Sequence, residues 1–241
     1  MSSLPLVDRA EALRSIPDMP NRVEFRAVAL DAASTIFRSG RGLLLVDARQ
    51  TTVCVLGEVT MANLTSLVRS RNIDCELVAE ERAVAALRDE LDWHSARIAT
   101  LAGPWQPPRN AHARLAVRPL RANDPLEHLP DDVQQEIARF RDACTVFVGV
   151  VDGRVVCVAY APWASESWAD IGIDTHEEFQ NQGIGTQVAA ALIESILAAG
   201  KQPVWGAEED NGASLRLADK LGFRTPAGRL WVAEGSAVIG G

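Results

Sequence analysis

The feature that most constrains the fold is a glycine-containing turn between a predicted strand and a predicted helix. The turn reads Gln-Asn-Gln-Gly-Ile-Gly-Thr over residues 180–186 and follows a strand-like run over residues 168–175. Apolar residues then recur at helical spacing, at Val188, Ala191, Leu192, Ile196 and Ala199. A glycine-rich turn that opens a helix directs several backbone N–H groups and the positive end of the helix dipole towards one point. The stretch therefore predicts an anion site, and the anion expected there is a pyrophosphate.

Length and composition indicate a globular protein with a substantial core. The chain has 241 residues, enough for one large or two small domains, and 47% of them are hydrophobic. No apolar run reaches the length of a membrane span, and the first residues lack the features of a secretory signal. We therefore expect a cytoplasmic protein without membrane contact. The four cysteines are not closely paired, so we expect buried thiols and no metal site.

The charge of the chain is unevenly distributed. The net charge of −8 argues against nucleic acid as a partner. Residues 111–241 carry 11 basic and 18 acidic side chains, and no Lys or Arg lies between Arg154 and Lys201. An acidic region beside an anion site predicts a second, cationic ligand nearby. A solvated acidic surface is the alternative.

A proline-rich stretch over residues 102–110 predicts a linker between two parts, residues 1–110 and 111–241, because its three prolines exclude a helix. Before it, strands are predicted at 43–46, 52–56, 76–79 and 96–101, and helices at 61–71 and 80–91. After it, strands are predicted at 115–119, 145–151, 154–161, 168–175, 203–207 and 229–233. Helices are predicted there at 131–141, after the turn, and at 213–221. The order predicts a mixed α/β fold with one parallel crossover around residues 171–207.

Three common phosphate or hydrolase motifs are absent from the sequence. A Rossmann fingerprint needs a third glycine where Val188 stands, and Gly200-Lys201 is followed by Gln202 rather than by the Ser or Thr of a P-loop. No G-x-S-x-G elbow occurs. The turn is therefore not explained by a dinucleotide, a P-loop nucleotide or a serine hydrolase site.

The pattern that fits is Q-x-x-G-x-G over residues 180–185, followed by a second segment that runs from Asn211 through Ser214 to Leu221-Gly222-Phe223. Together they resemble the coenzyme-A-binding core of the GNAT superfamily of N-acetyltransferases. The resemblance covers about residues 113–233, is sharpest over 168–223, and is closest to a branch of two-part acetyltransferases. It implies a GNAT fold for residues 111–241, with residues 1–110 as a smaller α/β domain that loosely resembles a degenerate half of the same fold.

The resemblance implies acetyl-CoA as co-substrate and a set of residues that bind it. The backbone N–H groups of residues 182–186 are the expected phosphate donors, and an N–H near Ile173 or Thr175 is expected to polarise the thioester carbonyl. Gln180 stands where many relatives have arginine, so it adds hydrogen bonds but no charge. The expected coenzyme contacts are Ile173, Thr175, Gln180, Gln182, Gly183, Ile184, Gly185, Thr186, Asn211 and Ser214. Asn211 is also a candidate N-cap of the following helix.

The acceptor amine must lose a proton, and a carboxylate is the expected base. Asp170 is the first candidate, Asp174 shares its strand face by alternation, and Glu208 lies at the end of the neighbouring strand. Many relatives have a tyrosine that acts as the general acid at the position where this chain has Ala218. The sequence does not settle which carboxylate acts or what replaces that tyrosine.

The sequence therefore predicts acetyl transfer from acetyl-CoA to the primary amine of a small cationic acceptor by direct attack on the thioester. A non-catalytic acyl-CoA-binding or regulatory module is the alternative. No metal, nucleic acid or membrane is expected to take part, and a homodimer is left open.

Overall fold

The computed structural model describes residues 4–71, 75–88, 90–108 and 114–238. The chain divides into two compact units. Unit 1 comprises Met1–Ile98, Ala207–Asp210 and Ala227–Gly241, and unit 2 comprises Ala99–Gly206 and Asn211–Pro226. The predicted division at residue 110 stays a prediction, since residues 109–113 lie outside the described part.

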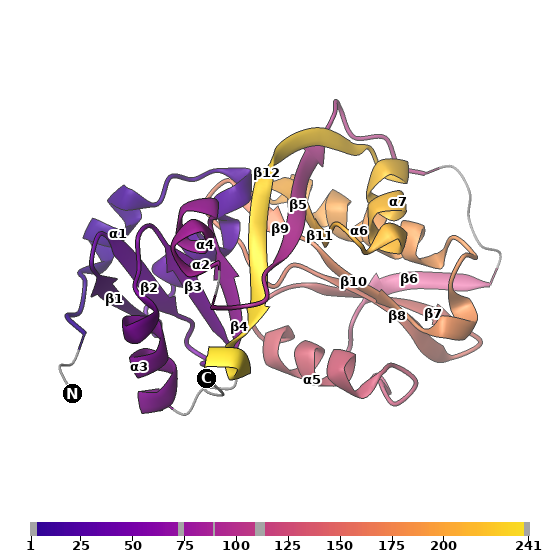
Figure 1. The fold of residues 1–241 in the computed structure, drawn as a ribbon. Coiled ribbons are helices and arrows are strands. Elements are labelled where there is room, and N and C mark those ends of the chain that lie inside the picture. Colours follow the sequence, from indigo (N-terminus) through magenta and orange to yellow (C-terminus); the bar gives the residue numbers. More distant parts are fainter. Residues whose placement is uncertain (1–3, 72–74, 89, 109–113, 239–241) are drawn as a thin grey trace. The chain divides into compact units, whose positions relative to one another are not determined.

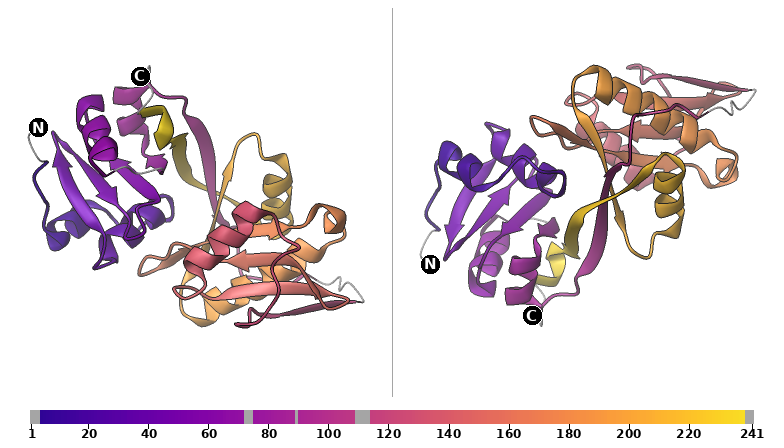
Figure 2. Two further views of the ribbon diagram at one scale, coloured as in Figure 1. Left: turned by 90° about the horizontal axis from the view of Figure 1, so that it is seen from below. Right: turned by 90° about the horizontal axis from the view of Figure 1, so that it is seen from above.

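Unit 1 is a mixed sheet with helices on both faces. Its strands lie in the order β1-β2-β3-β4-β12-β5; their bounds are β1 Thr35–Ser39, β2 Gly42–Val46, β3 Thr52–Leu56, β4 Glu76–Ala79, β5 His94–Leu101 and β12 Phe223–Glu234. Neighbours are antiparallel from β1 to β3, β4 runs parallel to β3, and β12 pairs antiparallel with β4. Helices α3 (Met61–Arg71) and α4 (Glu81–Leu87) cover one face. Helices α1 (Arg9–Ser15) and α2 (Val23–Leu30) lie on the other face of β1–β4 (Figure 2).

The sequence predictions for unit 1 hold from residue 43 onward. The strands over 43–46, 52–56 and 76–79 and the helix over 61–71 are confirmed within one residue, whereas the helix predicted over 80–91 ends at Leu87. The sequence reading missed α1, α2 and β1. Pro17 and Pro20 interrupt the helical pattern there, and the two helices that remain are seven and eight residues long, too short for a clear periodicity.

Unit 2 holds two groups of paired strands. One has the order β12-β5-β11-β9 and the other β10-β8-β7-β6, with β6 Leu115–Pro119, β7 Val146–Val151, β8 Arg154–Tyr160, β9 Trp168–Asp170, β10 Gly172–Thr175 and β11 Gln202–Glu208. Helix α5 (Asp131–Phe140) covers one face of the second group and α6 (Ile184–Ala198) covers the opposite face (Figure 1). Helix α7 (Gly212–Lys220) precedes β12. β5, which precedes residues 102–110 in the chain, thus lies between β12 and β11.

The strand predicted over residues 168–175 is two strands, not one. β9 pairs parallel with β11 through Trp168–Gln202 and Asp170–Val204, while β10 pairs antiparallel with β8. Ile171 lies between them. The single-strand prediction was wrong because both halves carry strand-forming residues, and only their different partners separate them. The chain therefore changes sheet at this residue.

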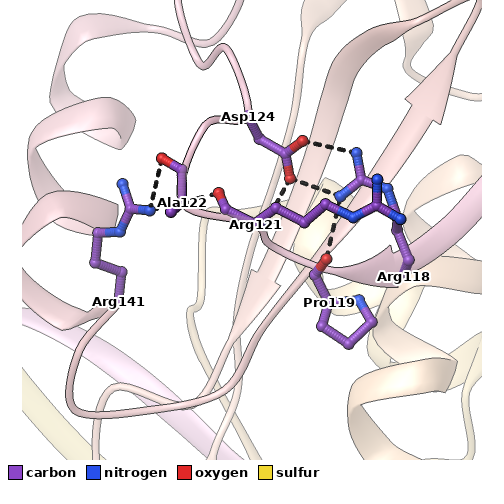
Figure 3. A network of polar contacts seen from close by, with 6 residues as sticks. All are labelled: Arg118, Pro119, Arg121, Ala122, Asp124 and Arg141. Carbon is purple, nitrogen blue, oxygen red and sulfur yellow. Dashed lines mark hydrogen bonds and ion pairs between the residues drawn. The ribbon is translucent and has the colours of Figure 1, made fainter.

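An arginine–aspartate pair fixes the loop between β6 and α5. Arg118 donates two hydrogen bonds to the Asp124 carboxylate, at 2.6 and 2.7 Å (Figure 3). The N–H of Arg121 adds a third at 2.7 Å. The guanidinium of Arg118 lowers the pKa of Asp124 to about 2. This loop is thereby held against the end of β6 at neutral pH.

The described residues include no helix long and apolar enough to cross a membrane. Among the same residues, no group of three or more His, Cys, Asp or Glu side chains is arranged to hold a metal ion.

Candidate active site

The predicted anion site is a sharp turn that leads into α6. Gly183 is the N-cap of the helix and has φ of +81°, as the turn predicted, and Asn181 has φ of +59°. A left-handed backbone favours glycine because it has no Cβ. Open space surrounds the position where a Cβ of Gly183 would lie. The first N–H groups of the fifteen-residue helix lie at this turn, where an anion is stabilised.

Gly185 allows α6 to begin close to β10. A Cβ built on it would lie 3.2 Å from Oγ1 of Thr175 and 3.5 Å from Cδ1 of Ile173. The two residues that flank Gly185, Ile184 and Thr186, are buried, with 1% and 4% of their surface exposed. Only their backbone N–H groups are therefore placed to meet a ligand outside the core.

The two glutamines of the turn bind the protein's own backbone. Nε2 of Gln180 donates to the carbonyl oxygen of Thr175 at 3.1 Å, and Nε2 of Gln182 donates to the carbonyl oxygen of Glu178 at 2.8 Å. Both side chains thus brace the turn against the preceding segment. Any affinity of the turn for an anion rests on backbone N–H groups and the helix dipole.

Two backbone N–H groups of β10 face away from its partner strand β8, next to this turn. The N–H of Ile171 donates to the carbonyl oxygen of Val204 in β11 at 3.1 Å. Successive peptide groups of a strand point to alternate sides, so the N–H groups of Ile173 and Thr175 face the same side, away from β8. β10 is the edge strand of its group in the described residues. These two N–H groups are therefore placed to donate to a ligand atom beside β10.

Asn211 and Ser214 shape the start of α7. Oδ1 of Asn211 accepts from the N–H of Ser214 at 3.0 Å, which confirms its predicted role as N-cap. Oγ of Ser214 accepts from Nε1 of Trp205 at 2.9 Å. Trp205 is 2% exposed and packs on Phe223, with ring centroids 5.4 Å apart. Both polar residues thus have structural partners in the described protein.

Asp170 lies at the end of β9, where the two strands separate. Burial, with a smaller contribution from the negative charge of Glu136, raises the pKa of its carboxyl to about 7. Hydrogen bonds from the backbone N–H groups of Ile171 and Gly206 oppose this shift. The raised pKa lies nearer neutral pH than that of an exposed aspartate, the condition that suits a group that takes and gives protons.

Asp174 faces Tyr160 across the β8–β10 pair. Oη of Tyr160 lies 3.5 Å from Oδ2 of Asp174, and Tyr160 is 3% exposed. Gly172 lies directly opposite Tyr160, and a Cβ there would lie 2.7 Å from the tyrosine ring. Burial and then the charge of Glu136 raise the pKa of Asp174 to about 6, while the tyrosine hydrogen bond lowers it. Burial of the Tyr160 hydroxyl, followed by the negative charge of Glu136, also raises the pKa of Tyr160.

Glu136 on α5 was missed by the sequence reading, although its charge acts on Asp170, Asp174 and Tyr160 together. The sequence contains a signal for it. Glu136 lies three residues after Val133 and four before Phe140, both in the apolar stripe of α5. An acidic residue at the edge of a buried stripe marks a carboxylate directed towards the sheet rather than into solvent.

Glu208, the third candidate base, lies in the other unit. It is exposed at the end of β11 and belongs to unit 1, where it lines a cavity with Glu76, Asp92 and Glu234. Asp170 and Asp174, by contrast, lie in unit 2 with the turn and the edge of β10. Asp170 and Asp174 lie in different strands on either side of Ile171, and the charge of Glu136 acts on both. That they share one strand face stays a prediction.

Comparison with known proteins assigns this region to a family. Residues 132–227, about two fifths of the chain, match the family model of the GNAT acetyltransferases. The match runs from α5 into β12 and includes the turn, both aspartates and α7. No curated protein matches the sequence.

Solved structures share the fold over nearly the whole chain. A GCN5-related N-acetyltransferase-like protein from Streptococcus suis is 18% identical, with 94% of this chain and 100% of that chain covered and a TM-score of 0.72. A GCN5-related N-acetyltransferase from Kribbella flavida is 11% identical, with 92% and 95% covered and a TM-score of 0.62. A tandem GNAT protein from the clavulanic acid biosynthesis pathway is 15% identical, with 97% and 98% covered and a TM-score of 0.56. At these identities the likeness shows the fold.

Proposed function

We propose that this chain, whose residues 132–227 match the GNAT acetyltransferase model, transfers an acetyl group from acetyl-CoA to the primary amine of a small cationic acceptor. The observation that carries the proposal is the separation of β9 from β10 at Ile171. This separation places the carboxyl group of Asp170 and the outward N–H groups of Ile173 and Thr175 within six residues of one another. The turn at Gly183, which opens α6, follows β10 in the chain. A base, a carbonyl-polarising edge and an anion site are what thioester aminolysis requires.

The phosphates of the coenzyme are assigned to the turn. The N–H groups of residues 182–186 and the dipole of α6 supply the donors. Gln180 and Gln182 hold the turn in shape through their bonds to backbone carbonyls. The thioester carbonyl then accepts from the N–H of Ile173 or Thr175 on the edge of β10. Asn211 and Ser214 order the start of α7 through their hydrogen bond, and this end of the helix is assigned to lie beside the coenzyme.

In the reaction, the amine nitrogen forms a bond to the acetyl carbonyl carbon and the carbon–sulfur bond of the thioester breaks. The ammonium of a free amine has a pKa near 10.4, so only about one molecule in 10³ is neutral at pH 7. Asp170 is assigned as the base that takes this proton. Its pKa of about 7 is closer to the pKa of the ammonium than the pKa of an exposed carboxyl group is, so the proton transfer is less unfavourable. The departing thiolate takes a proton from water, because the usual tyrosine position is Ala218.

The acceptor is assigned as cationic because of the charges around Asp174. Burial raises the pKa of both Asp170 and Asp174, and repulsion by the negative charge of Glu136 raises both further. An ammonium group placed among them relieves the repulsion. Tyr160 holds the Asp174 side chain through its hydroxyl group. A neutral amine of the same size gains nothing from this arrangement.

The rival function is a module that binds acyl-CoA without turnover. Two observations favour it: Ala218 replaces the usual acid, and Gln180 is engaged with the Thr175 carbonyl rather than with a ligand. Release of the free thiol from acetyl-CoA, measured with a panel of monoamines, diamines and neutral amines, separates the two. The proposal predicts turnover that is fastest with diamines. Coenzyme binding without thiol release on any amine would establish the rival.

A further inference from the structure

Five arginine side chains line one cavity of unit 1. The cavity has a volume of about 560 Å³, within the range of sites that hold small molecules. The arginines come from five separate parts of the unit and are Arg22, Arg38, Arg41, Arg82 and Arg229. Two carboxylates, Glu80 and Glu81, line the same cavity. The lining is thus positive in a chain whose net charge is −8.

Arg22 is the most firmly held of the five. One nitrogen of its guanidinium pairs with Glu80, and the two side chains are 21% and 14% exposed. Its Nη1 is buried and has no hydrogen-bond partner among the residues the structure describes. A buried donor without an acceptor is costly, and because Nη1 is closed to solvent, a ligand in the cavity meets the other nitrogens of this guanidinium. The guanidinium itself lies over the ring of Phe25, 5.5 Å from its centroid.

The outer arginines form pairs that a ligand can replace. Arg41 and Glu58 are 3.8 Å apart with side chains 87% and 63% exposed, and Arg229 and Glu209 are 2.8 Å apart with 59% and 43% exposed. Exposed pairs of this kind contribute little stability. Each guanidinium has five N–H donors, so one carboxylate leaves several of them available. These side chains can therefore turn towards an anion at little cost.

Most of the remaining lining is apolar or lacks side chains, and Ser15 and Asn21 add two neutral polar groups. Leu43, Leu56 and Leu230 contribute apolar side chains, and Gly42, Gly57 and Gly228 contribute bare backbone. Small-molecule sites commonly combine such a wall with a few charged groups that fix the orientation. The cavity thus suits a ligand with one strongly anionic end and a less polar remainder.

We propose that unit 1 binds a small phosphorylated molecule in this cavity, with the phosphate held by Arg22, Arg41 and Arg229. A phosphate monoester carries up to two negative charges and three acceptor oxygens, which matches several guanidinium groups converging from different elements. This site is separate from the turn at Gly183, and its existence does not depend on acetyl transfer.

The test is calorimetric titration of the full chain with pyrophosphate, inorganic phosphate and citrate. The titrations use the Gly183→Glu variant, so that the turn at α6 does not bind the same probes. Pyrophosphate is expected to bind, and the Arg41→Gln/Arg229→Gln double substitution is expected to weaken it at least tenfold. Arg114→Gln is the matched control, because Arg114 is an exposed arginine of unit 2 at 75% exposure. It is expected to leave the affinity unchanged.

Three results would overturn the proposal. The first is no heat of binding with millimolar pyrophosphate. The second is equal affinity in the double variant and the Arg114→Gln control, which would place the binding elsewhere. The third is tighter binding of citrate than of pyrophosphate, which would assign the cavity to carboxylates. Circular dichroism of each variant shows whether the fold is kept, and single Arg41→Gln and Arg229→Gln variants replace the double variant if it unfolds.

Discussion

The substitution Asp170→Asn is expected to stabilise the fold at alkaline pH while it impairs the reaction. Burial keeps Asp170 protonated up to about pH 7 in the folded protein, against an ordinary value of 3.8 in the unfolded chain. The folded state therefore binds more protons than the unfolded state between pH 4 and 7, and the free energy of unfolding falls as pH rises through this window. Three pH units at about 1.4 kcal/mol each amount to roughly 4 kcal/mol. Asparagine fits the same space and carries no such penalty.

The assay is urea unfolding of the wild type and the variant at pH 4.5 and pH 8. The stability difference in favour of Asp170→Asn should grow between the two pH values by about 2–4 kcal/mol, the lower figure allowing for partial solvent access. Thiol release at saturating acetyl-CoA should fall by about 10²-fold or more. Asp142→Asn, at an exposed position of the same unit, is the control. A pH-independent stability difference together with unchanged turnover would refute the assignment of Asp170.

Three further substitutions test the surroundings of the site. Tyr160→Phe removes the hydrogen bond that lowers the neighbouring β10 carboxyl's pKa, so carbon-13 NMR should show that carboxyl titrating above about 6; an unmoved titration contradicts the contact. Gly172→Ala places a Cβ 2.7 Å from the Tyr160 ring and should cost about 1–3 kcal/mol in urea unfolding, whereas Gly103→Ala, in open space, should cost much less; equal costs would count against this packing. Asp124→Asn should cost about 2 kcal/mol at pH 7, because the pKa lowered by Arg118 stabilises the fold above pH 4, and the cost should vanish as pH falls through about 2; a cost that persists at pH 2 argues against the ion pair.

The turn and its helix could be predicted from the sequence because their causes are local. A left-handed residue before a helix calls for glycine, and Gly183 and Gly185 stand at the required spacing. Asn211 as N-cap is local in the same way, since its side chain reaches a backbone N–H three residues on. Such features depend on the residues alone and not on which strands become neighbours.

The arrangement of the carboxylates could not be predicted because it depends on pairing. Nothing in residues 168–175 distinguishes one strand from two, and the change of partner at Ile171 decides where Asp170 and Asp174 point. The contact between Tyr160 and Asp174 follows from the β8–β10 register, which no local pattern specifies. Glu208 was named as a candidate because it ends the neighbouring strand, and the point at which β11 passes from unit 2 to unit 1 is likewise not marked in the sequence.

The turn at Gly183 is proposed to bind acetyl-CoA, and acetyl transfer is proposed to depend on that binding. The most direct measurement is calorimetric titration of acetyl-CoA into the wild type and into Gly183→Glu, with thiol release on a diamine followed in the same samples. The added carboxylate lies at the helix-opening turn and repels phosphate, so binding and thiol release should be lost together in the variant while the circular dichroism spectrum stays unchanged. Full affinity for acetyl-CoA in Gly183→Glu, with the fold intact, would contradict the account.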